Sequence, residues 1–77
     1  MAIYKVIIKT EGNKTTYTTN ATTFATITRL TDSGKFDVTT PDWMQLTDTS
    51  EEADKIAREF TTKVMASVGV LPDFINE

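Results

Sequence analysis

The 77-residue sequence contains no cysteine and no histidine. Without cysteine the chain can form neither a disulfide framework nor a thiolate metal ligand, and it has no thiol nucleophile. Without histidine it lacks the commonest metal ligand and the commonest acid–base group near neutral pH. Because nucleophilic catalysis usually depends on one of these residues as nucleophile or base, we expect a protein that is not an enzyme and binds no cofactor.

Long hydrophobic runs are also missing, since no stretch approaches the roughly 20 apolar residues that span a bilayer. Lys5 and Lys9 interrupt the first apolar run, and no small-residue cleavage site of a signal peptide follows. We therefore expect a cytoplasmic protein that does not bind membranes. The length predicts a single domain, residues 1–77. A chain of this size buries only about 60% of its unfolded surface, so we also expect oligomerisation to reinforce it.

Positive charge is scarce in one part of the chain. The net charge is −3, and no Lys or Arg lies between Lys35 and Lys55. The acidic residues of that stretch are Asp37, Asp42, Asp48, Glu51, Glu52 and Asp54. The negative total argues against direct binding to nucleic acid. The acidic stretch permits the opposite hypothesis, a mimic of nucleic acid that binds the cationic groove of a nucleic-acid-handling protein.

The first structural signal is a β-hairpin. Residues 2–10 alternate as a strand does, and Gly12-Asn13 suits the centre of a type II′ turn. Closing the hairpin at this turn pairs Ile8 with Tyr17. The residues that then share one face are Tyr4, Val6, Ile8, Tyr17 and Ala21.

A second hairpin is predicted around Asp32-Ser33-Gly34, a three-residue loop with glycine in the left-handed position. Pairing across this loop sets Arg29 opposite Asp37 and Thr28 opposite Val38. The residues that would then face the same way are Phe24, Leu30, Phe36 and Val38.

The segment at about residues 21–33 also permits a helix. Phe24, Ile27 and Leu30 recur at helical spacing. The many threonines of the segment oppose this interpretation, because β-branched residues lose χ1 freedom in a helix. We favour a strand over residues 23–31 and keep a β-β-α-β-α order as the alternative.

The clearest element is a C-terminal helix. Thr49 and Glu52 have the spacing of a capping box, and Gly69 is a suitable stop. Its apolar stripe comprises Ala53, Ile56, Ala57, Phe60 and Val64. Together the elements predict an α+β fold in the order β-β-β-β-α, a four-stranded antiparallel sheet of two hairpins packed against one C-terminal helix. The apolar tail, residues 70–75, is expected to pack against another surface.

The feature that points most directly to function is a surplus of apolar residues. The predicted register places Ile3, Ile7 and Ile27 on the face of the sheet that the helix does not cover. Either the tail or a partner must shelter them. We therefore predict a small protein-binding module, an adaptor or inhibitor, that forms a homodimer and makes its apolar contact through these three residues.

Two further groups complete the predicted contact residues. Asp42 and Trp43 are candidates for a peripheral anchor, because aromatic residues dominate interface energetics. Asp48, Glu51 and Glu52 would carry the alternative function, the nucleic-acid mimic, although a helix N-terminus attracts acids without any partner. No catalytic residue or metal ligand is predicted, because the serines and carboxylates have ordinary positions in turns and at the start of the helix.

Overall fold

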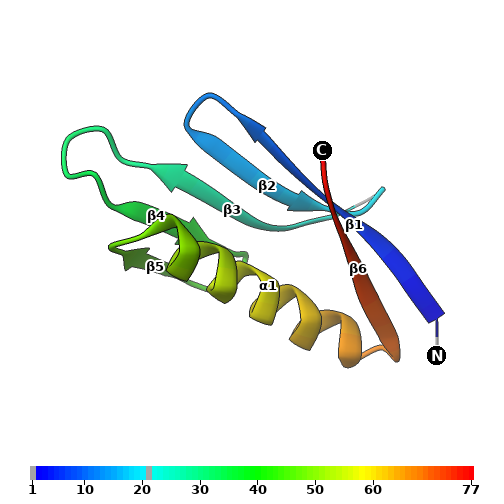
Figure 1. The fold of residues 1–77 in the computed structure, drawn as a ribbon. Coiled ribbons are helices and arrows are strands. Elements are labelled where there is room, and N and C mark those ends of the chain that lie inside the picture. Colours follow the sequence, from blue (N-terminus) through cyan, green and yellow to red (C-terminus); the bar gives the residue numbers. More distant parts are fainter. Residues whose placement is uncertain (1, 21) are drawn as a thin grey trace.

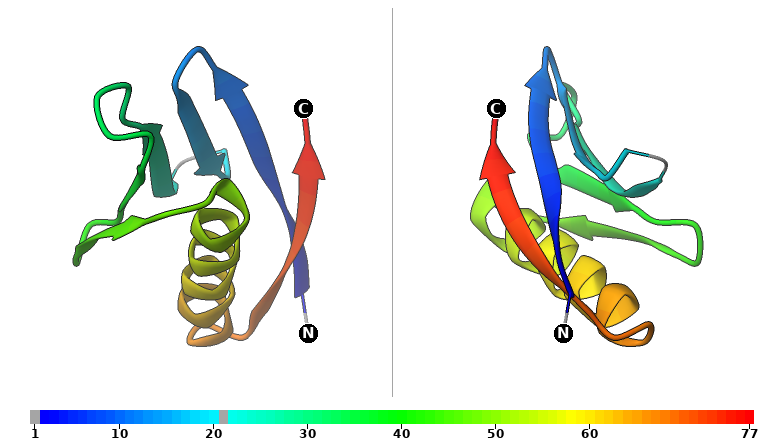
Figure 2. Two further views of the ribbon diagram at one scale, coloured as in Figure 1. Left: turned by 60° about the vertical axis from the view of Figure 1, so that its left-hand side comes forward. Right: turned by 90° about the vertical axis from the view of Figure 1, so that its right-hand side faces the viewer.

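A computed structural model describes residues 2–20 and 22–77 of the protein (Figure 1). Its strands are β1 (Ala2–Glu11), β2 (Lys14–Thr18), β3 (Thr23–Arg29), β4 (Phe36–Thr39), β5 (Met44–Thr47) and β6 (Val70–Asn76), and its helix is α1 (Ser50–Ala66). The strands form one six-stranded sheet in the order β5-β4-β3-β2-β1-β6. The helix lies against one face of this sheet (Figure 2). The predicted α+β class with one C-terminal helix is therefore confirmed.

The sheet differs from the predicted four-stranded antiparallel sheet by two strands. β5 pairs antiparallel with β4, whereas β6 pairs in parallel with β1, so the sheet is mixed. β6 contains Pro72, which can occupy only an edge strand because it has no N–H to donate. The Glu77 N–H donates to the Ile8 carbonyl at 2.9 Å. Because alternate residues of a strand point to opposite sides, Pro72 faces the open edge and leaves the ladder intact.

The first hairpin is confirmed. Ile8 pairs with Tyr17, and Gly12 has a φ of +58°. No non-glycine residue of the described chain has a positive φ, and this excludes a type I′ turn and agrees with type II′. Ala21, which the prediction placed on the same face, lies outside the described residues.

The second hairpin confirms the strand and overturns the helical alternative, but its loop is longer than predicted. The Leu30 N–H donates to the Lys35 carbonyl at 2.8 Å, and the Gly34 N–H donates to the Leu30 carbonyl at 2.9 Å. The loop therefore has four residues, 31–34, and not three. Gly34 has the expected left-handed backbone, with a φ of +72°.

The extra loop residue shifts the register of β3 and β4. The predicted pairs Arg29–Asp37 and Thr28–Val38 are wrong by one residue, and Ile27 pairs with Val38 instead. A shift of one residue moves a side chain to the other face of a sheet. Ile27 is consequently buried beneath α1, with 6% of its surface exposed, and does not lie on the uncovered face as predicted.

The core lies between α1 and the inner face of the sheet. It consists of Val6, Ile8, Tyr17, Ala25, Ile27, Val38, Ala53, Ala57 and Met65. The helix begins at its predicted cap, where the Thr49 hydroxyl accepts the Glu52 N–H at 3.1 Å. Ala53 and Ala57 lie at the contact, and their small side chains allow the helix to approach the sheet closely and leave the interior close-packed. Among the described residues, no helix is long and apolar enough to cross a membrane.

Candidate interaction surfaces

The second face of the sheet carries no helix in the described chain (Figure 2). The pairing registers and the alternation of side chains along each strand determine which residues lie on it. Towards the β6 edge these are Ile3, Lys5, Ile7, Leu71, Asp73 and Ile75. Threonines occupy the middle, and Met44 and Leu46 lie at the β5 edge. The face is therefore apolar at its two ends and polar at its centre.

An apolar strip runs along β1 and β6. Ile3 lies beside Leu71, and Ile7 lies beside Ile75. Ile3 is 66% exposed and Leu71 is 42% exposed, whereas Ile7 and Ile75 are half-buried. We call these four residues the β1/β6 strip. It confirms the predicted orientation of Ile3 and Ile7.

Leu71 and Ile75 were missed as surface residues in the sequence. Their segment alternates apolar and polar residues in part, but Pro72 in its middle argues against a strand. Covering of the apolar face by the tail is one of the two alternatives that the sequence leaves open. Instead the tail enlarges that face by adding a strand at the edge of the sheet.

One pair of opposite charges divides the strip. Lys5 and Asp73 are direct neighbours in the register of β1 and β6, and both are exposed. In the part of the chain that the structure describes, neither forms an ion pair. Both charges therefore remain available to a partner.

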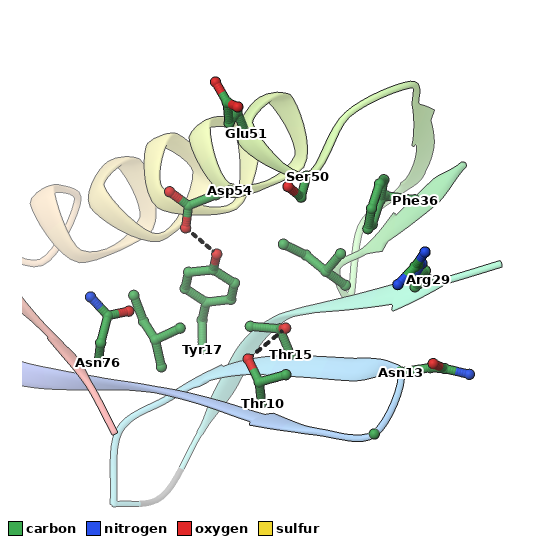
Figure 3. Close-up of a pocket in the computed structure, with 13 residues that line it drawn as sticks. Thr10, Asn13, Thr15, Tyr17, Arg29, Phe36, Ser50, Glu51, Asp54 and Asn76 are labelled. Atoms are coloured by element: carbon green, nitrogen blue, oxygen red, sulfur yellow. Dashed lines mark hydrogen bonds between the residues drawn. The ribbon is translucent and has the colours of Figure 1, made fainter. Parts of the chain in front are cut away.

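A cleft of about 440 Å³ with both polar and apolar walls lies between the first hairpin and the start of α1 (Figure 3). The helix packs against β3, β4, β5 and β6, and this leaves part of β1 and β2 facing the cleft. The Thr10 and Thr15 hydroxyls hydrogen-bond to each other at 2.9 Å on the hairpin side. Tyr17 reaches across from β2 and donates its phenol proton to Asp54 of α1.

Asp54 is the centre of a group of side-chain contacts that links β2, α1 and β6, and we call this group the tie. The Arg58 Nε–H group contacts both Asp54 carboxylate oxygens, at 3.0 and 2.9 Å. The Arg58 guanidinium lies 5.0 Å from the ring centroid of Phe74, a cation–π contact with β6. Burial, and then the hydrogen bond to Asp54, raise the pKa of the Tyr17 phenol. The Tyr17 phenol therefore stays protonated further into the alkaline range than an ordinary tyrosine, and it is the donor that links β2 to α1.

No known protein family matches this chain, and no curated protein or solved structure is significantly similar to it. Any statement about its function therefore depends on the surfaces of this molecule.

Trp43 and Asp42 lie in the turn between β4 and β5. The Thr40 hydroxyl accepts the N–H groups of Asp42 and Trp43, at 3.2 and 3.1 Å. The Trp43 ring meets that of Phe60 in α1 edge to face, with centroids 5.5 Å apart. Trp43 thus anchors the turn to the helix, away from the β1/β6 strip.

The acidic stretch is divided among several surfaces. Asp48, Glu51 and Glu52 are exposed around the start of α1, where the helix dipole favours negative charge. Asp37, in contrast, lies on the uncovered face of the sheet, and Asp54 is engaged by Tyr17. Over residues 2–20 and 22–77, no group of acidic side chains is arranged to hold a metal ion. The acidic surface predicted for a nucleic-acid mimic is accordingly confined to three residues.

Proposed function

We propose that the protein is a non-enzymatic protein-binding module that forms a homodimer through the β1/β6 strip. The observation that carries this proposal is the exposure of Ile3 and Leu71 side by side on a face that no helix of the described residues covers. Contiguous apolar residues at a surface are typical of interaction sites. The strip also contains two of the three isoleucines for which a partner is predicted from the sequence.

The order of residues along the strip favours a second copy as the partner. A two-fold axis parallel to β1 would place β1 of one subunit over β6 of the other. Ile3 would then contact Leu71, and Lys5 would meet Asp73 of the other subunit. Apolar groups would thus face apolar groups, and each charge would face its opposite.

The expected dimer is weak. Two sheets that pack face to face lie about 10 Å apart, and their strands align within about 30°. The strip is only two strands wide, so it offers less than the about 800 Å² per subunit that a standard interface buries. We therefore expect a dissociation constant on the order of 10 to 100 µM.

Sedimentation velocity at about 10 to 300 µM, a range that brackets this affinity, tests the dimer. Ile3→Asp should give a monomer at all concentrations. Met44→Asp is the matched control, because Met44 is 65% exposed on the same face at the opposite edge, and Ile3 is 66% exposed. A wild-type monomer throughout, or a dimer that persists in Ile3→Asp, contradicts the proposal.

The nucleic-acid mimic is the second candidate, favoured by the joint exposure of Asp48, Glu51 and Glu52 at the start of α1. It predicts a nucleic-acid-binding partner that is retained at low salt and lost when the three acids are replaced by Asn or Gln. The same replacement should leave the dimer unchanged. A partner whose retention does not respond to salt argues against the mimic.

A further inference from the structure

β1 has neighbours on both sides over only part of its length. β6 pairs with it from Ala2 to Ile8, whereas β2 pairs with it only from Ile7 to Glu11. β2 ends at Thr18, and the next strand of the chain is β3, which lies on the other side of β2 from β1 (Figure 1). In the described chain, residues 2–6 therefore have no pairing strand on the β2 side.

The backbone groups at this open edge belong to Ile3 and Lys5. The Ile8 carbonyl points towards β6, where it accepts the Glu77 N–H. Because the groups of alternate residues point to opposite sides of a strand, those of Tyr4 and Val6 also face β6. The N–H and C=O groups of Ile3 and Lys5 face the open edge, spaced by roughly 7 Å as in any antiparallel ladder. Another extended backbone satisfies this spacing.

Two grooves flank the edge. One has a volume of about 520 Å³ and is lined by Ile3, Tyr4, Lys5, Ile7, Thr19 and Asn20. The other lies towards the end of α1, has a volume of about 240 Å³, and is mostly apolar. Its walls include Phe24, Val64, Val68 and Val70. Tyr4 and Thr19 line both grooves, so the grooves meet at the open edge.

We infer that the open half of β1 binds an extended peptide segment of another protein as an added antiparallel strand. Side chains of an extended peptide alternate between the two faces, so each groove would receive its own. This site goes beyond the proposed dimer. It shares the Ile3 and Lys5 side chains with the dimer contact, but its hydrogen bonds and its helix-side groove are separate from that contact.

The chemistry of the edge specifies the peptide. The residue opposite Lys5 is acidic, because opposite charges stabilise a cross-strand pair. The next residue lies opposite Tyr4 and is apolar, since it enters the helix-side groove. The third residue lies opposite Ile3 and is also apolar, since it enters the groove that Ile3 and Ile7 line on the other face of the sheet. In the antiparallel direction the motif reads acidic, apolar, apolar.

Amide hydrogen exchange by NMR, with the probe acetyl-Thr-Glu-Val-Ile-Thr-amide, tests this site. The measurement uses the Leu71→Asp variant, which should remove the dimer contact because Leu71 belongs to the β1/β6 strip. The variant leaves both grooves intact, since Leu71 lines neither of them. At a peptide concentration of about ten times its dissociation constant, exchange at Ile3 and Lys5 should slow about tenfold. The amides of Tyr4 and Val6 are the internal control, because they donate to β6 and should be protected without peptide.

Two variants test the specificity. Lys5→Glu should reverse the preference between this peptide and a second one in which Lys replaces Glu. Val68→Asp, at a 75% exposed position in the helix-side groove, should weaken both peptides about tenfold, because it places a charge where an apolar side chain binds. Met44→Asp should leave the affinity for both peptides unchanged.

Exchange at Ile3 and Lys5 that is already slow without peptide, or that does not respond to it, overturns this inference. An unchanged preference in Lys5→Glu overturns the motif. These failures leave the dimer proposal standing if Ile3→Asp still gives a monomer. Conversely, peptide binding together with a wild type that stays monomeric at all concentrations removes the dimer proposal alone.

Discussion

The two faces of the sheet carry similar apolar residues in different surroundings. Ile8 on the inner face is 6% exposed, and Ile3 on the outer face of the same strand is 66% exposed. Burial of apolar surface contributes about 25 cal/mol per Å², so the inner residues stabilise the fold and the outer ones leave that free energy available for binding. Position relative to α1, and not residue type, separates a core residue from a contact residue.

The largest expected effect contrasts one residue of each face. Ile27→Ala should lower the free energy of unfolding by about 3 kcal/mol, because it leaves a cavity beneath α1. Ile3→Ala, on the other face, should change it by less than about 0.5 kcal/mol. Urea denaturation of both variants measures the difference. Equal losses would mean that both faces are buried in solution.

Removing the tie on the helix side should have the next largest effect. Tyr17→Phe deletes the hydrogen bond to Asp54 and retains the buried ring, so we expect a loss of about 1.5 kcal/mol. Urea denaturation at pH 7 measures it. Lys9, on the other face, contacts Glu11 at 2.9 Å and Glu77 at 3.8 Å, all three exposed. A Lys9→Gln variant with as large a loss would contradict the contrast between a partly buried tie and an exposed ion pair.

The same tie predicts a dependence on alkaline pH. Burial raises the pKa of Tyr17 in the folded protein, so folding favours the protonated phenol. Its contribution is fully present below the pKa of an unfolded tyrosine, about 10, and is lost as the pH rises through the folded value. The free energy of unfolding should fall more steeply above about pH 10 in the wild type than in Tyr17→Phe. Parallel curves for the two proteins would argue against a raised pKa.

Removing the N-terminal cap of α1 should reduce stability by a smaller amount. The cap bears on the comparison of the two faces because α1 covers only one of them. Thr49→Ala removes the acceptor of the Glu52 N–H and should cost about 1 kcal/mol. Thermal unfolding followed by circular dichroism measures this loss. Thr23→Ala, at an exposed position on the outer face, is the control and should lie within about 0.5 kcal/mol of the wild type.

The smallest expected effect concerns the exposed ion pairs of the outer face. Lys9→Gln should leave the urea midpoint unchanged, because exposed ion pairs contribute little to stability. The measurement at low and high salt checks this expectation. If the urea midpoint of the variant falls at low salt only, the ion pairs of Lys9 with Glu11 and Glu77 contribute to stability through their charges.

Local signals made part of the fold predictable. Gly12 and Asn13 define the first turn, and Thr49 begins the helix, because a turn residue or a cap acts on its own few neighbours. The register of the second hairpin could not be predicted in this way. Loops of three and four residues both suit Asp32-Ser33-Gly34, and the choice between them is made by burial of Ile27 under α1.

The candidate surfaces were also predicted only in part, because local signals do not specify which distant segments meet. Ile3 and Ile7 could be placed on an outer face because they alternate with Val6 and Ile8. Leu71 could not, because its strand pairs with β1 across the whole length of the chain. Parallel neighbours need a crossover connection, which here runs from Glu11 to Val70, and no local pattern records which strand they will meet.

The sequence by itself determined the absence of thiol and imidazole chemistry, the α+β content, and the positions of the first turn and the helix. Only the tertiary structure decided which apolar residues stay outside and that, within residues 2–20 and 22–77, the first half of β1 lacks a neighbour on one side. The physical reason is one of range. Turns and caps depend on atoms a few residues apart, whereas faces and edges depend on which distant strands pair and on what the single helix covers.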